Sequence, residues 1–198
     1  MSTVSLAQPI VDPIWRLPSR GRVAMLSLII GETAIFTIFI VAYLFYTGKS
    51  LHGPTPRQVL EIPLFNTICL LSSSLTITFA ERSIEKGRIR SFSLWWATTM
   101  TLALIFIAGT AREWQRLIYH DGLTIQTNLF GTTFYSLVGL HATHVVAGLA
   151  MLSLVLLFTL AGRVNEEHAE RVKVLALYWH FVDAVWVAVF TVVYIVGR

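Results

Sequence analysis

The chain has 198 residues, of which 55% are hydrophobic and only 13% are charged, and its formal net charge is +4. A soluble domain usually carries about 25% charged residues, so a water-soluble fold of this length would leave much of its apolar surface exposed. The composition therefore excludes an ordinary soluble domain and indicates a protein that lies in lipid.

Runs of apolar residues with few or no charges follow one another along the chain and predict an all-α integral membrane bundle of five transmembrane helices. Each run is near or above the roughly 18–20 residues that cross the hydrocarbon core as a helix, and a spanning segment must satisfy its own backbone hydrogen bonds. The fourth run is too short for two crossings and a turn, so it predicts one long or tilted helix. The predicted spans cover residues 23–46, 62–81, 91–111, 129–161 and 174–197.

The basic residues predict how this bundle is oriented. Ten of the fifteen Lys and Arg residues precede the first span or lie in the second-to-third and fourth-to-fifth connections. The positive-inside rule then places the polar N-terminal segment 1–21 in the cytoplasm and the C-terminus of the transmembrane domain, 22–198, outside. We interpret the positive charge as a topology signal and expect no nucleic-acid partner.

Glu32 is an ionisable residue near the middle of the first span. A charged carboxyl is costly in a membrane and is usually protonated, paired, or turned toward a polar interior. Two interpretations stay open. Glu32 either takes part in a proton relay or contacts a lipid headgroup or neighbouring helix, or it is a neutral, hydrogen-bonded packing residue.

Two pairs of polar residues repeat a spacing of three, which places each pair on one helical face: His180 with Asp183, and His141 with His144. The first pair could fix a histidine tautomer for proton transfer or metal binding, although such pairs more often satisfy each other between helices. The second pair could ligate a metal or haem, but it has no convincing third and fourth ligand. We expect no metal and no redox centre in this chain.

The second span contains many small and polar side chains, including Asn66. Such residues let helices approach closely and hydrogen-bond across their interface, so we interpret them as packing residues. The sequence shows no broken-helix or inverted-repeat pattern that would favour a transporter.

Four stretches in order resemble subunit III of the haem–copper terminal oxidases, the cytochrome c oxidase family, and the resemblance runs from about Arg22 to the end. They are I-G-E-T-A-I-F (30–36), P-L-F-N-T-I-C-L-L-S-S-S-L-T (63–76), Glu113-Trp114 with F-G-T-T-F-Y-S-L-V-G-L-H-A-T-H-V-V-A-G (130–148), and Y-W-H-F-V-D-A-V-W (178–186). The family's mitochondrial-type members have two further N-terminal helices that open a lipid-filled cleft. The resemblance implies that this chain starts at the third of the family's helices, as the five-helix bacterial type does.

The resemblance implies a non-catalytic subunit in a bacterial plasma membrane, packed against subunit I together with subunit II and other oxidase subunits. Subunit I holds the haems and copper, reduces dioxygen to water and pumps protons. Subunit III stabilises the complex, holds phospholipid and sustains proton uptake, and no cofactor is expected in this chain. Glu32 matches a buried carboxyl known for carbodiimide reactivity. The other matched intramembrane polar residues are expected to be structural: Asn66, Glu113, His141, His144, His180 and Asp183.

Other functions fit the same sequence. A quinol oxidase subunit III and the membrane protein that accompanies nitric oxide reductase are related alternatives, because the electron donor contacts other subunits. A stand-alone small transporter or channel with a solute site near Glu32 is the alternative from a different class.

Overall fold

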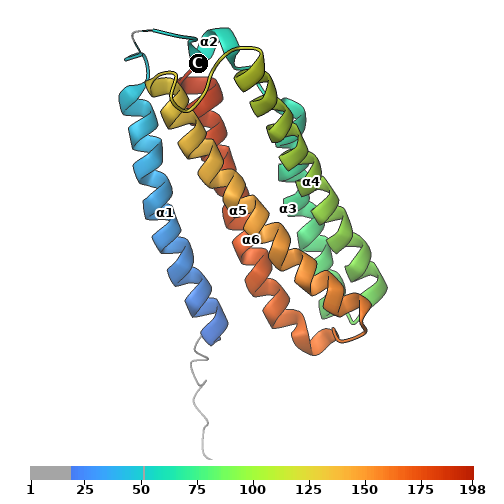
Figure 1. Ribbon diagram of the computed structural model, residues 1–198. Coiled ribbons are helices and arrows are strands. Elements are labelled where there is room, and N and C mark those ends of the chain that lie inside the picture. Colours follow the sequence, from blue (N-terminus) through green and yellow to red (C-terminus); the bar gives the residue numbers. More distant parts are fainter. Residues whose placement is uncertain (1–18, 51) are drawn as a thin grey trace, which may run out of the picture.

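The computed structural model describes residues 19–50 and 52–198, and the predicted segment 1–21 lies almost wholly outside them. The described chain is helical (Figure 1), and five of its helices are long and apolar enough to span a membrane. The predicted all-α bundle of five spans is thereby confirmed. The long helices are α1 (Arg20–Tyr46), α3 (Leu64–Glu85), α4 (Ile89–Tyr119), α5 (Leu129–Leu160) and α6 (Ala169–Phe190).

Short elements complete the chain. The helix α2 (Pro56–Val59) lies in the connection between α1 and α3, and the 3₁₀ turn η1 (Glu166–His168) leads into α6. A π-helical segment, η2 (Thr191–Val196), continues α6 to the end of the fifth span.

Capping side chains define where two of the long helices begin. The Ser19 side chain accepts a hydrogen bond from the Arg22 backbone N–H at 3.3 Å, and the Asn128 side chain accepts one from Gly131 N–H at 2.8 Å. Each cap satisfies a backbone donor that has no partner within the first helical turn. Between α3 and α4 the chain reverses at Gly87, whose φ of 65° suits a residue without a side chain.

Helix α4 extends to Tyr119, well beyond the end at 111 predicted for the third span. The apolar run stops where Arg112, Glu113 and Arg116 begin, but the helix continues because two of these charged side chains find partners from other elements. Glu113 accepts a hydrogen bond from Tyr194, and Arg116 pairs with Glu61. Hydropathy marks where the charges start, not where the backbone stops being helical.

The five spans are arranged around α5 and α6. Helix α1 packs against α5 and α6 at one edge, while α3 and α4 form an antiparallel pair on the other side (Figure 1). Helix α3 also contacts α6, and α4 also contacts α5. The start of α1 and the C-terminus lie at opposite ends of the bundle, as an odd number of spans requires. The side of the membrane on which each end lies stays a prediction.

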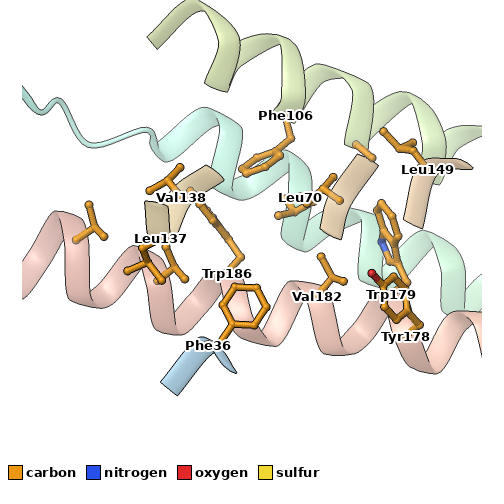
Figure 2. Close-up of a cluster of buried hydrophobic side chains, with 14 of the residues drawn as sticks. Phe36, Leu70, Phe106, Leu137, Val138, Leu149, Tyr178, Trp179, Val182 and Trp186 are labelled. Atoms are coloured by element: carbon orange, nitrogen blue, oxygen red, sulfur yellow. The ribbon is translucent and has the colours of Figure 1, made fainter. Parts of the chain in front are cut away.

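Aromatic side chains of α6 fill the centre of the bundle (Figure 2). Trp179 and Trp186 are both buried, and their indole N–H groups donate to α3, to Ser73 Oγ at 2.8 Å and to Thr67 Oγ1 at 3.2 Å. Gly148 of α5 lets that helix approach the Trp179 ring closely, because a Cβ there would lie 2.7 Å from the ring. The polar side chains of α3 and the small residue of α5 thus hold α6 in the interior.

Candidate functional site

The intramembrane polar residues gather in separate places rather than in one pocket. Glu32 and His144 meet between α1 and α5. Ser74, His180 and Asp183 meet between α3 and α6. The remaining residues, Asn66 and Glu113, lie toward the other end of the bundle, where Glu113 contacts Tyr194.

Glu32 is paired with His144, a partner that the sequence did not identify. The carboxyl Oε2 lies 3.0 Å from His144 Nε2, while His144 Nδ1 lies 2.8 Å from its own helix at Leu140 O. A carbonyl oxygen can only accept, so Nδ1 carries a hydrogen. Nε2 then either accepts from a protonated Glu32 or, in the imidazolium form, donates to the carboxylate. Either state satisfies both side chains, which are 23% and 13% exposed.

His141 does not join that pair. Its ring is fully buried between Trp186, with centroids 4.9 Å apart, and Phe106, at 5.9 Å. Neither ring nitrogen has a hydrogen-bond partner among the residues that the structure describes. His141 therefore faces α4 and α6 while His144 faces α1, and the two histidines that share a spacing do not share a site.

The donor side chains of the described residues do not form a metal-ion cluster. Across residues 19–50 and 52–198, no three His, Cys, Asp or Glu side chains lie close enough together to hold a metal ion. The buried ring nitrogens of His141 have aromatic neighbours, and His144 already has a partner at each nitrogen.

His180 and Asp183 are brought together, but through a third residue. Ser74 Oγ of α3 lies 3.1 Å from His180 Nδ1 and also hydrogen-bonds Asp183 Oδ2. On its other side, His180 Nε2 lies 4.0 Å from Glu81 Oε2. Sequence analysis missed Ser74 and Glu81 as members of this group. The small and polar side chains of the second span, among them Ser74, are the signal for this contact, and by themselves they predict only helix packing.

A second polar group lies at the opposite end of α3 and α4. Tyr194 O–H donates to both carboxyl oxygens of Glu113, at 3.0 and 3.1 Å. Glu113 and Asn66 line a cavity of about 290 Å³ with Arg112, Arg116 and Glu61. Asn66 packs against Gly109, where no side chain would fit beside it.

Arg116 and Glu61 form an ion pair at the mouth of this cavity, with Nη1 and Oε1 2.5 Å apart. The hydrogen bond from Arg116 and its positive charge hold the pKa of the exposed Glu61 carboxyl below the usual value. Arg116 also donates to Val59 O at 3.0 Å, which ties the end of α2 to α4. These polar contacts join the ends of the helices to one another.

Comparison with known proteins places this arrangement in context. A family model described as "Cytochrome c oxidase subunit III" matches residues 20–198. The chain is 34% identical over 169 residues to cytochrome c oxidase subunit 3 of Alkalihalophilus pseudofirmus, covering 84% of this chain and 82% of that protein. It is 31% identical over 193 residues to the protein of the same name from Thermostichus vulcanus, covering 95% and 93%. A third relative of that name, from Corynebacterium diphtheriae, is 37% identical over 139 residues, covering 69% and 67%.

Proposed function

The chain belongs to the cytochrome c oxidase subunit III family, and from this membership we infer that it is a subunit of a bacterial cytochrome c oxidase. In this proposal it packs beside subunit I, the haem–copper catalytic subunit, in a complex that also contains subunit II. The haems and copper lie in those partners. The complex lies in the plasma membrane, with the start of α1 on the cytoplasmic side.

The match that covers residues 20–198 is the observation that carries the proposal, because it includes all five spans. The internal geometry supports a non-catalytic role. The two histidines of α5 have different neighbours. His141 packs against aromatic rings, and His144 hydrogen-bonds to Glu32. Electron transfer and dioxygen reduction are therefore assigned to the partner subunits.

Within the complex, we assign this chain two supporting tasks: stabilising subunit I and sustaining its proton uptake. Helix α1 presents many exposed apolar side chains, such as Ile30, Ile38 and Val41. This surface suits contact with a partner helix or with the acyl chains of bound phospholipid. Glu32, beside this surface, is the candidate for contact with lipid or for proton exchange.

Affinity purification of the chain in mild detergent, followed by a visible absorption spectrum, tests the proposal. We expect co-purified subunits I and II, an a-type haem spectrum and oxygen consumption from reduced cytochrome c. Activity only with a quinol would reassign the chain to a quinol oxidase, and b-type haem with nitric oxide turnover to a nitric oxide reductase complex. A colourless preparation without partner subunits, active in substrate uptake by vesicles, would overturn the oxidase role and favour a stand-alone transporter.

A further inference from the structure

The contact between α3 and α6 places a carboxyl, a hydroxyl and an imidazole in one hydrogen-bonded line. Ser74 Oγ is shared between Asp183 Oδ2 and His180 Nδ1. Asp183 is 3% exposed, and its Oδ1 has no hydrogen-bond partner among the described residues. Ionising the carboxyl in this position costs free energy, because the negatively charged Oδ1 would have neither a hydrogen-bond donor nor water beside it. The neutral acid avoids that cost.

The hydroxyl of Ser74 allows the line two arrangements in which every hydrogen bond is formed. A hydroxyl has one proton to donate and lone pairs with which to accept. In the first arrangement, His180 Nδ1–H donates to Ser74, and Ser74 O–H donates to an Asp183 carboxylate. In the second, a protonated Asp183 donates to Ser74, and Ser74 donates to an unprotonated Nδ1. Both keep every hydrogen bond, so the two differ only in which end holds the proton.

The line opens at His180 onto a charged cavity at the end of the bundle where α1 begins. The cavity measures about 240 Å³ and receives side chains from three helices: Arg22 of α1, Glu81 of α3, and Glu170, Lys173 and His180 of α6. His180 is 38% exposed, and its Nε2 faces Glu81 at 4.0 Å. Lys173 is held by Glu85 at 2.5 Å, so this cation is already paired.

The facing helix α5 carries two histidines, and neither hydrogen-bonds to the line. His141 is buried between Trp186 and Phe106, and His144 is paired with Glu32. That pair also shows what a closed arrangement looks like, because His144 Nδ1 points at Leu140 O, which cannot take up a proton. His180 differs because one ring nitrogen faces the cavity and the other faces a hydroxyl. His180, unlike His144, therefore connects a cavity to a buried carboxyl.

We propose that Glu81, His180, Ser74 and Asp183 form a proton-binding relay, in which Asp183 stores a proton taken from the cavity. A proton from cavity water, guided by Glu81, binds His180 Nε2. The Nδ1 proton passes to Ser74 Oγ, and the Ser74 hydroxyl proton passes to Asp183 Oδ2. One proton enters and one is stored, no electron moves, and the imidazole is left neutral as its other tautomer. The reverse sequence releases the proton. The geometry stands by itself, whereas use of the stored proton by an oxidase rests on the proposed function.

Infrared spectroscopy of the purified chain, with whatever partners it retains, tests the relay. The carbonyl stretch of protonated Asp183 is identified as the band lost in Asp183→Asn, and its shift after transfer to D₂O reports proton exchange. We expect exchange within the mixing time in the unmodified protein. Ser74→Ala and His180→Gln should keep the band but slow its exchange by about tenfold or more, since exchange would then require local opening of the helix pair.

Two matched variants separate relay from packing. Ser153→Ala removes a half-buried hydroxyl of α5 that bonds only the backbone at Leu149 O. Glu32→Gln removes the carboxyl of α1, which pairs with His144 and does not hydrogen-bond to the line. Both should leave the exchange of the Asp183 band unchanged. Equal exchange rates in Ser74→Ala, His180→Gln and the unmodified protein, or no carbonyl band assignable to Asp183, would overturn the proposal. These readouts need no oxidase activity, so they fail or succeed independently of co-purification with subunits I and II.

Discussion

Helices α1 and α6 are both apolar enough to cross a membrane, yet they occupy opposite environments. The buried residues of α1 are Phe36 and Tyr43. Helix α6 buries far more of its length, including Trp179, Asp183 and Trp186. Lipid tails are as apolar as a hydrophobic core, so apolarity alone does not decide which helix is interior. Hydrogen bonds from indole groups and close approach at small residues decide it.

The carboxyls of the two helices follow the same division. Glu32 of α1 lies at the edge, 23% exposed, and reaches His144 of α5. Asp183 of α6 is 3% exposed and reaches Ser74 of α3. The edge carboxyl has one partner that satisfies it in either protonation state. The interior carboxyl belongs to a line that continues to a cavity. Three predictions test whether edge and interior differ in energy as they do in geometry, and a fourth concerns an exposed ion pair outside both.

The largest effect is expected at the contact between α5 and α6. In Gly148→Val, the new Cβ would lie 2.7 Å from Trp179, whose ring is held by its bond to Ser73 and cannot easily move aside. We expect a loss of about 3 kcal/mol in stability, measured by thermal unfolding in detergent. Gly31→Val on α1 is the matched control, because its Cβ meets no heavy atom of the described chain within 4 Å. Equal stability of the two variants would contradict the interior position of α6.

A smaller effect is expected for removal of a buried indole. Trp186→Phe loses the hydrogen bond to Thr67 and leaves space beside Phe106, which should cost about 2 kcal/mol. Trp95→Phe at the periphery removes a 38% exposed indole that packs on Phe79, and we expect less than about 0.5 kcal/mol. Thermal melts of both variants, followed by tryptophan fluorescence, measure the difference. A Trp95 variant that is the less stable of the two would reverse the comparison.

The carboxyls provide the next test. Glu32→Gln keeps a hydrogen-bonding group beside His144, so we expect assembly and initial oxygen consumption close to those of the unmodified protein and a stability change below about 0.5 kcal/mol. Asp183→Asn should cost more, about 1 kcal/mol, because the amide is confined with Ser74 in the interior. Oxygen uptake and unfolding are measured on the same preparations. Loss of haem incorporation or of all initial activity in Glu32→Gln would rule out a supporting role for that residue.

The smallest effect is expected at the exposed ion pair between Glu61 and Arg116. Arg116 lowers the pKa of Glu61 in the folded protein, so the pair contributes stability above the ordinary carboxyl value of 4.5 and loses it as the pH falls through the lowered pKa. At pH 7, Glu61→Gln should therefore melt slightly below the unmodified protein, and on acidification the difference should vanish. High salt should reduce it in the same way. A difference that grows on acidification would show that the sign is wrong.

Much of the fold follows from the sequence. The apolar runs with few or no charges predicted the number and order of the spans, because crossing a membrane requires a predominantly apolar helix of a given length. The end of α4 did not follow, since Glu113 and Arg116 continue the helix with partners from η2 and from the connection after α2. Those partners are distant in sequence, and no local pattern reveals them.

The candidate residues show the same limit. Spacing placed His141 beside His144 and His180 beside Asp183 on helical faces, but a shared face does not give a shared partner. His141 turned toward Trp186 and His144 toward Glu32, while Ser74 from another helix joined His180 to Asp183. Helical periodicity describes one helix, whereas these contacts depend on the rotation and depth of two.

The sequence by itself determined that this chain spans a membrane five times, and its motifs identified the family to which it belongs. Hydropathy and the length of each apolar run are sufficient for the first, because a backbone that crosses lipid must form its hydrogen bonds within its own helix. Only the tertiary structure decided that α6 is interior and α1 peripheral, and that Asp183 contacts Ser74 and, through it, His180 at the wall of a cavity. The physical reason is that, within lipid, helices associate through packing and hydrogen bonds between side chains, which exist only after the helices have met.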